Sequence, residues 1–276
     1  MIYIKKSNEI MVIREGGKRL SSILNRLIKE IHPGVETQYL EDLANKLIKE
    51  EGALPAFKNY PMGGGIFFPS SLCVSINNEV VHGASLPSRV IKNGDIVDLD
   101  IGMEWPVTFE LREKLKLPTN PYSKNGGFFT DMCATVGAGA INQEAKKLLK
   151  VSHECLEKAL KQVKAGNRIN DIARAVEGHA DKYGYGVVRD LVGHGVGYFA
   201  HEKPDVFNFE ISENSPENIV LREGMIIAIE PMINAGTWKI KMAKNNYTVL
   251  TADNSLSAHF EHTVLVKKDG CEILTK

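Results

Sequence analysis

A helix pair followed by strands occurs in each half of the chain, and this repeat limits the folds that the chain can adopt. In the first half, residues 9–31 place apolar side chains three and four positions apart, which is the period of an amphipathic helix. A second helix follows over 37–52. The second half repeats the pattern with helices over 142–163 and 170–184. We therefore predict an internal duplication, with two similar halves facing each other across one sheet.

The two helix pairs can also be aligned position by position. Placing Gly34 over Gly166 superimposes the turns that join the helices. In the first pair, Thr37 is the expected N-cap of the second helix and Gly52 its end. The same alignment pairs Leu40 with Ile172, Leu43 with Ala175 and Gly52 with Gly184.

Strand-like segments follow each helix pair, which makes the predicted fold class α+β with mainly antiparallel sheet. They are rich in β-branched and apolar residues and are bounded by glycine or polar turns. They cover residues 72–83, 94–105, 126–137, 224–234 and 260–268. Residues 104–126 are charged, contain prolines and are long for a connection, so we expect a protruding excursion or a mobile loop there. The chain, residues 1–276, is expected to form a single domain with this excursion inserted.

The overall charge makes polyanions poor candidate partners, because 34 Lys and Arg balance 34 Asp and Glu. The N-terminus lacks the apolar core of a signal peptide, and no segment approaches the about 18 apolar residues that a spanning helix needs. The four cysteines form no C-x-x-C pair, which is typical of free thiols in a reducing cytosol. We therefore expect a cytoplasmic monomer that binds neither a membrane nor a specific nucleic acid.

Several carboxylates occupy strand segments in which they are hard to explain as surface groups. Asp98 and Asp100 alternate with apolar residues, and taken alone this pattern is typical of an exposed strand face. Asp131 lies in a strand with almost no other charge, and Glu230 is the only charge of its strand segment. Glu261 directly precedes an apolar run. A buried carboxylate is costly unless it is paired or bound to a cation, and no Lys or Arg lies beside these groups.

Metal ions are the simplest counter-charges for such groups. The candidate ligand set comprises Asp100, Asp131, His194, Glu230 and Glu261. If these residues converge, their four negative charges balance two divalent cations. An oxygen-rich set with one nitrogen suits Mn, Fe(II), Co or Zn in a two-metal centre, which activates water and polarises carbonyls. For any one of the carboxylates, a structural hydrogen bond is the alternative explanation.

These residues lie in motifs through which the chain resembles the type I methionine aminopeptidases, metallopeptidases with the pita-bread fold. The motifs follow the family's order over nearly the whole chain. They read IKKSNEIMVIREGG, HPGVET, SINNEVVHG, GDIVDLDIG, TDMCATVG, GHGVGYFAHEKP, IEPMINAG and SLSAHFEHTVLV. The resemblance implies a duplicated half-fold, one catalytic domain, and metal-dependent removal of N-terminal methionine from peptides and nascent proteins.

The resemblance also implies a role for each residue of the ligand set. Asp100 and Asp131 match the family's paired aspartate ligands. Asp131 and Glu261 would bridge the two metal ions, while His194 and Glu230 would bind one of them. All five ligand positions hold the expected residue type.

Three side chains are implied in the reaction itself. Glu230 would act as the general base toward the bridging water, besides being a ligand. His201 would donate a hydrogen bond to the substrate carbonyl or the tetrahedral intermediate, and His82 would lie near the scissile amide and the leaving amine. The glycines between His194 and His201 would let the backbone pass close to the site.

Five other histidines carry no predicted role. His32, His153 and His179 lie at turn or helix positions and are expected to be solvated. His259 and His262 flank a predicted ligand, which alone is not evidence of function. We interpret His262 as a residue that supports a ligand or the structure.

The pocket for the N-terminal side chain departs from the family's pattern. Ala200 stands before His201 where the family usually has phenylalanine, and the segment before SINNEVVHG is longer than usual. Tyr247 stands where a tryptophan or another aromatic residue is common. The expected pocket residues are Tyr60, Phe68, Cys73 and Tyr247, with His82 and His201. We therefore expect a preference for methionine that is less exclusive than in relatives with the phenylalanine.

Two alternative functions stay open. Prolidases and X-Pro aminopeptidases share these ligands. They usually carry an additional N-terminal domain, whereas only 81 residues precede His82 in this chain. A pita-bread protein that only binds a ribosome or another partner is the second alternative, and the complete ligand set argues against it. The expected partner is a peptide or a nascent-protein N-terminus. The sequence leaves open a transient contact with the ribosome, the physiological metal and the role of residues 104–126.

Overall fold

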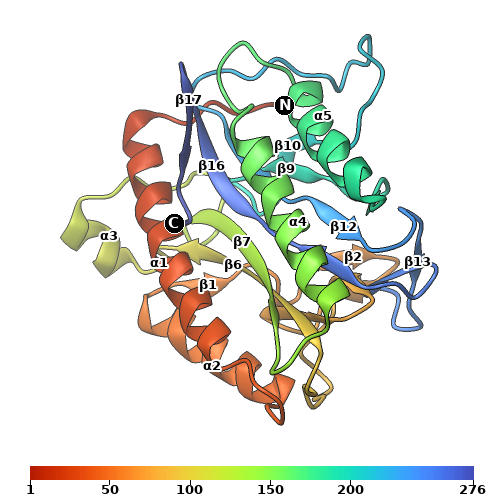
Figure 1. Cartoon of the computed structure of the whole chain (residues 1–276). Helices are drawn as coiled ribbons and strands as arrows, with labels where there is room; N and C mark the ends of the chain where they lie inside the picture. The colour runs from red at the N-terminus through yellow and green to blue at the C-terminus, as the bar shows by residue number, and fades with distance from the viewer.

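Two helix pairs form the outer layer of the molecule, as the repeat predicts (Figure 1). The first pair is α1 (Ser7–Lys29) and α2 (Thr37–Glu50), and the second is α4 (Gln143–Leu160) and α5 (Ile169–Ala180), which a 3-10 turn extends over Asp181–Tyr183. The structure, a computed structural model, describes residues 1–276. None of its helices is both long and apolar enough to cross a membrane.

The start of α2 differs from the prediction, because Thr37 is not its N-cap. Glu36 occupies the cap position and Thr37 is the first helical residue. The Thr37 hydroxyl instead donates to the Ser85 carbonyl oxygen at 2.6 Å and accepts from the Arg89 amide at 2.9 Å. A long-range tie to another segment has taken the hydroxyl away from the local capping role.

The strands of both halves pair in antiparallel fashion, and every predicted strand segment contains one or two of them. In the first half, β6 (Ile96–Trp105) pairs along its whole length with β7 (Phe128–Gly137), and its other edge pairs with β4 (Leu72–Ile76) and β1 (Leu54–Pro55). In the second half the strand order is β10 (Glu202–Val206), β9 (Gly193–Gly195), β11 (Ile226–Ile229), β16 (His262–Lys267) and β17 (Gly270–Ile273).

Three smaller sheets complete the structure. One joins β13 (Ile240–Met242), β14 (Val249–Thr251) and β5 (Glu79–Val81), and another joins β15 (Ser257–His259), β12 (Met232–Asn234) and β8 (Gly186–Val187). A short hairpin of β2 (Pro61–Gly63) and β3 (Ile66–Phe67) lies in the segment that is longer than usual for the family.

The backbone supports the predicted alignment of the two halves. Gly34 and Gly166 have φ angles of 94° and 93°, and Gly52 and Gly184 have φ angles of 68° and 72°. Positive φ favours glycine, and each aligned pair of glycines occupies the same place in its helix pair. The halves therefore share turn geometry as well as element order.

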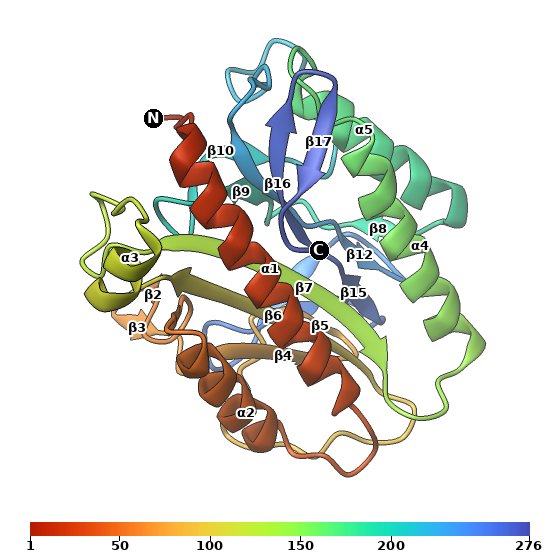
Figure 2. The same ribbon diagram turned by 90° about the vertical axis from the view of Figure 1, so that its left-hand side faces the viewer.

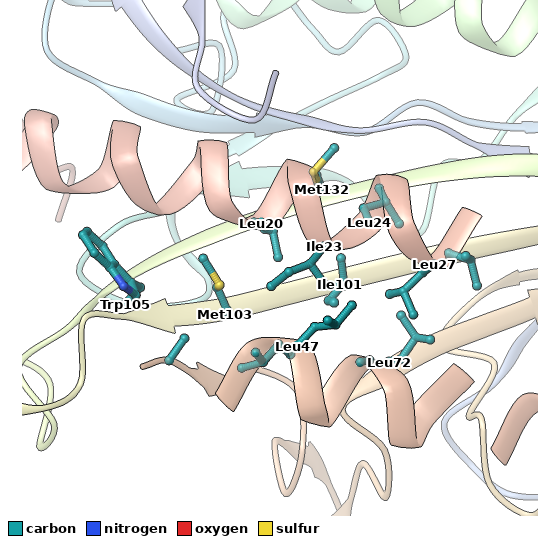
Figure 3. Close-up of a cluster of buried hydrophobic side chains, with 14 of the residues drawn as sticks. Leu20, Ile23, Leu24, Leu27, Leu47, Leu72, Ile101, Met103, Trp105 and Met132 are labelled. Atoms are coloured by element: carbon teal, nitrogen blue, oxygen red, sulfur yellow. The ribbon is translucent and has the colours of Figure 1, made fainter. Parts of the chain in front are cut away.

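Each helix pair buries an apolar face against the sheet of its own half. Helix α1 crosses β6 and β7 (Figure 2), and its Leu20 and Leu24 lie in one core with Ile101 and Met103 of β6. Leu47 of α2 packs into the same core, opposite the side chains of α1 (Figure 3). A second core lies beneath α4 and α5.

The other face of β6 is buried as well. The alternation of Asp98 and Asp100, taken alone, predicted an exposed strand face, and the structure does not have one there. Their side chains belong to residues that are only 2% and 8% exposed. The second half covers this face, since Thr135 beside Asp98 bonds to the carbonyl oxygen of His259 at 2.8 Å. The carboxylates therefore lie between the two halves of the molecule.

The connection between β6 and β7 protrudes from the body of the molecule (Figure 1). It begins after Trp105, so two of the residues predicted to belong to it are the end of β6. It contains a short helix, α3 (Phe109–Leu115), whose first turn is capped by the Thr108 hydroxyl, which accepts from the Leu111 amide at 3.3 Å. Of the two predicted forms, the structure has the protruding excursion.

Candidate metal centre

A cavity of about 320 Å³ lies between the two halves, and residues of both halves line it. Its lining includes every predicted ligand and both predicted catalytic histidines, namely Asp100, Asp131, His194, Glu230, Glu261, His82 and His201. No Lys or Arg lines this cavity. The structure thus brings together the residues that the sequence singled out, without a Lys or Arg to balance them.

Strands from both halves carry the candidate ligands to the cavity. Asp100 is on β6, and Asp131 on β7 is offset by two positions from it, so that both carboxylates share one face of the hairpin. His194 is the middle residue of β9. Glu230 directly follows β11, and Glu261 directly precedes β16. The two residues are neighbours across the ladder, because Ile229 at the end of β11 pairs with His262 at the start of β16.

The ligand atoms fall into two overlapping groups. Asp100, Asp131 and Glu261 form one group, and His194, Glu230 and Glu261 form the other, with the atoms of each group within 4.8 Å of one another. Asp131 also forms a group with His194 and His201, so it lies close to a member of the second group as well. Asp131 and Glu261 thus lie where ligands that bridge two ions would have to lie.

The four carboxylates fit divalent cations, because each has a buried oxygen without a hydrogen-bond partner. These atoms are Asp100 Oδ1, Asp131 Oδ1, Glu230 Oε1 and Glu261 Oε1. Burial raises the pKa of all four carboxyls, and the charge of Asp131 raises the pKa of Asp100 and Glu261 further. Bound divalent cations would supply the missing partners and favour the ionised forms.

The imidazole of His194 is held in the tautomer that a metal ligand needs. Its Nδ1 lies 2.9 Å from the Gly195 carbonyl oxygen, to which only a protonated nitrogen can donate. Its Nε2 therefore keeps a free lone pair, and this atom lies 3.3 Å from Glu230 Oε1. Burial lowers the pKa of His194 to about 3, so the ring is neutral at neutral pH.

The two predicted catalytic histidines flank this cluster. The ring centroid of His201 is 4.3 Å from that of His194, and the Tyr60 ring packs edge-on against His201 at 4.8 Å. His82 has a positive φ of 58°, and its carbonyl oxygen accepts from the Thr248 hydroxyl at 3.0 Å. Burial lowers the pKa of His82 to about 4, so this ring is neutral too.

His259 lines the cavity, although sequence reasoning gave it no role. It is 2% exposed, with Nδ1 3.6 Å from Asp98 Oδ2 and Nε2 3.6 Å from Glu230 Oε2. Burial alone would lower its pKa, but the charges of Asp98 and Glu230 outweigh burial and raise it well above the usual value. The signal was its place two residues before Glu261, since strand alternation puts such residues on one face.

Two other histidines, His262 and His179, lie outside the cavity. His262 contacts Thr275 Oγ1 at 3.0 Å and lies outside the cavity lining, consistent with a structural role. His179 was expected to be solvated, but it is 7% exposed and its Nε2 lies 2.8 Å from Glu154 Oε2. The expectation was wrong because α4 packs against α5 on the side that carries His179.

The apolar end of the cavity is formed mainly by the segment before β4. Tyr60, Phe68 and Cys73 line it, as predicted, together with Phe57, Pro61 and Met62. Tyr247 does not line the cavity but packs at right angles against Phe68, with ring centroids 5.6 Å apart. Ala200 does not line it either.

Known proteins are similar to this chain over its full length. The model of Metallopeptidase family M24 matches residues 12–108 and 122–268. The chain belongs to metallopeptidase family M24. The methionine aminopeptidase of Clostridium acetobutylicum is 40% identical over 275 residues, which cover 100% of this chain and 99% of that protein.

Solved structures agree with this assignment. The methionine aminopeptidase of Thermotoga maritima has a TM-score of 0.86 at 36% identity, covering 100% of both chains. The prolidase of Pyrococcus horikoshii has a TM-score of 0.71 at 23% identity. That match covers 99% of this chain and 63% of the prolidase, and it shows a shared fold alone. The predicted resemblance, the pita-bread fold of this M24 family member and its class as a hydrolase are confirmed.

Proposed function

We propose that the protein is a metal-dependent aminopeptidase that removes methionine from the N-terminus of peptides and nascent proteins. The observation that carries the proposal is the convergence of four carboxylates and one neutral imidazole on a single cavity, with one unpaired oxygen on each carboxylate. The full-length similarity to methionine aminopeptidases supports the choice of substrate. The single catalytic domain spans residues 1–276.

The M24 family implies a divalent metal, and the chain's own residues support two ions chosen among Co, Mn, Fe(II) and Zn. Asp131 and Glu261 would bridge them, Asp100 would complete one site, and His194 with Glu230 would complete the other. Metal ions held there would supply an activated water and polarise the scissile carbonyl. The apolar end of the cavity would hold the methionine side chain.

Three side chains of the protein would then act on the substrate. Glu230 would accept the proton of the attacking water, because its carboxylate faces the cavity beside His194 and Glu261. His201 would donate a hydrogen bond to the carbonyl oxygen as negative charge develops on it. His82 would lie beside the scissile amide nitrogen and orient the leaving amine.

We expect metal-reconstituted protein to cleave Met-Ala-Ser with a kcat/KM about a hundredfold or more above that for an Ala-Pro peptide, since a pocket shaped for one side chain discriminates on this scale. The measurement is a peptidase assay with both substrates in parallel. Faster cleavage of the X-Pro peptide would favour a prolidase-like enzyme. Cleavage of neither by metal-loaded protein would favour a binding module.

The strictness of the methionine preference is a separate prediction, which concerns Ala200. Ala200 is buried and does not line the cavity, so only a larger side chain at this position would reach it, and we expect Leu and Phe to be accepted more readily than in the Ala200→Phe variant. Lost apolar contact weakens discrimination by about 1–3 kcal/mol per methylene. The measurement is kcat/KM for X-Ala-Ser, with X as Met, Leu, Phe and Ala, on both proteins.

One outcome would contradict this expectation. If the parent rejects Leu and Phe as strictly as the Ala200→Phe variant does, another residue has closed the pocket. Tyr60 is the candidate, because its ring already lies against His201. Phe199 is not, since it packs against Tyr3 and Tyr122 instead.

We also propose a monomer in the cytoplasm, with peptides or nascent chains as its partners and a transient contact with the ribosome. Support for a reducing compartment comes from the cysteines, all four of which are free.

A further inference from the structure

We propose that the excursion between β6 and β7 positions His201, and that Asn120 is the residue that transmits this effect, a role that rests on the proposed function of the cavity. The M24 family match leaves out residues 109–121, which include Asn120. Asn120 would be a positioning residue, because it touches the loop that carries His201 and not the substrate.

Asn120 is fully buried, and both its amide nitrogen and its amide oxygen are hydrogen-bonded inside the protein. Its Nδ2 donates to the Gly127 carbonyl oxygen at 2.7 Å and to the Tyr198 carbonyl oxygen at 2.9 Å. Its Oδ1 accepts from the Tyr122 amide at 3.0 Å. One amide group thus closes the excursion on itself and ties it to the backbone three residues before His201.

Aromatic packing strengthens the same connection. The ring of Tyr122, which belongs to the excursion, lies 5.1 Å from the ring of Tyr198 and 5.6 Å from that of Phe199. Tyr3 contacts all three rings. The excursion therefore covers one side of residues 196–201, the loop that joins β9 to β10.

This loop needs external support because little within it fixes its path. Gly197 has a φ of 131°, a region that favours glycine, and the pairing of β9 with β10 is interrupted between Glu202 and Asp205. The Phe129 amide holds the Gly197 carbonyl oxygen at 2.8 Å, and the Asn120 amide holds the next carbonyl along. The first tether comes from the start of β7 and the second from within the excursion.

A displaced catalytic group costs rate even when it is still present, and a shift of about 1 Å can cost about a hundredfold. His201 would act on charge that develops during the reaction, so its displacement should lower kcat and leave KM nearly unchanged. A smaller folded fraction would also lower apparent kcat without changing KM, so a control variant and a His201→Ala background are needed to separate the two effects.

The test compares Asn120→Ala with Asn125→Ala in metal-reconstituted protein assayed on Met-Ala-Ser. Asn125 also belongs to the excursion, but its Nδ2 donates to Glu104 and does not touch the loop. We expect kcat to fall about tenfold for Asn120→Ala with KM nearly unchanged, whereas Asn125→Ala stays within about twofold of the parent.

A double-mutant cycle with His201→Ala then separates positioning from general destabilisation. If Asn120 acts through His201, Asn120→Ala costs no further rate in the His201→Ala background. An equal loss of rate in both backgrounds would overturn the proposal. Tyr122→Ala enters the same cycle as a variant expected to fold, because Tyr122 is 52% exposed, and its smaller loss of kcat should also vanish without His201.

Amide hydrogen exchange provides a readout that needs no substrate. Exchange over residues 196–202 should accelerate in Asn120→Ala and stay as in the parent in Asn125→Ala. Unchanged exchange in Asn120→Ala would reject the tether. If the parent itself fails to cleave Met-Ala-Ser, the proposed function fails, while the exchange experiment still decides whether Asn120 holds the loop.

Discussion

Removal of divalent metal is expected to abolish cleavage of N-terminal methionine, and Mn, Fe(II) or Co is expected to restore it. The reason is that the cavity's own groups are carboxylates and imidazoles, none of which both activates a water and polarises a carbonyl as a bound divalent cation does. The measurement is turnover of Met-Ala-Ser after dialysis against a chelator, followed by titration with each metal.

The same experiment has a stability readout that does not depend on turnover. Without cations, burial raises the pKa of Asp100, Asp131, Glu230 and Glu261, so the ionised carboxylates that a metal needs are disfavoured in the empty site. A ligand that binds only the folded state stabilises it by about 2.7 kcal/mol at a concentration one hundred times its Kd. Metal should therefore raise the thermal midpoint of unfolding as it restores activity. Full turnover by protein shown by elemental analysis to hold no metal would overturn the two-metal proposal.

The isolated carboxylates made the site predictable from the sequence. A lone Asp131 or Glu230 in an apolar strand has few structural explanations, because the energetic cost of burying a charge depends little on the details of the fold. The strands that carry them follow a period of two, which fixes the faces on which they lie. These two facts, together with the family's motifs, were enough to name the four carboxylates of the candidate ligand set and three of the histidines that line the cavity.

Residues whose role depends on contacts between the two halves were harder to predict. The alternation around Asp98 and Asp100 is the same for a solvated face and for a face covered by another layer. Only the packing of the second half against β6 decides between the two. The burial of His259 between Asp98 and Glu230 depends on the same packing, so local pattern alone gave it no weight.

The excursion shows a second limit. Its composition predicted a protrusion, but the bond from Asn120 to the Tyr198 carbonyl oxygen joins segments far apart in the chain. No periodicity or motif connects these two positions. The same applies to Thr37, whose hydroxyl bonds to the Ser85 carbonyl oxygen instead of capping its own helix.

Glu230→Gln is expected to lower kcat/KM about a thousandfold or more, because it removes a ligand charge and the proton acceptor together while keeping the size of the side chain. The variant should also hold less metal, since Glu230 belongs to the group with His194 and Glu261. The measurements are kcat/KM on Met-Ala-Ser and metal content by elemental analysis. Parent-like activity in this variant would exclude Glu230 as the base.

His201→Ala is the matched variant, and metal content is what separates the two roles. The geometry alone leaves both open, because a ring nitrogen of His201 groups with Asp131 and His194 at ligand spacing. If His201 donates to the developing oxyanion, its loss lowers kcat about tenfold to a thousandfold and leaves metal content as in the parent. Carboxylates and His194 would still hold the ions, since none of the candidate ligands has been removed. Loss of metal from His201→Ala, to the extent found for Glu230→Gln, would make His201 a ligand and leave the oxyanion without its proposed donor.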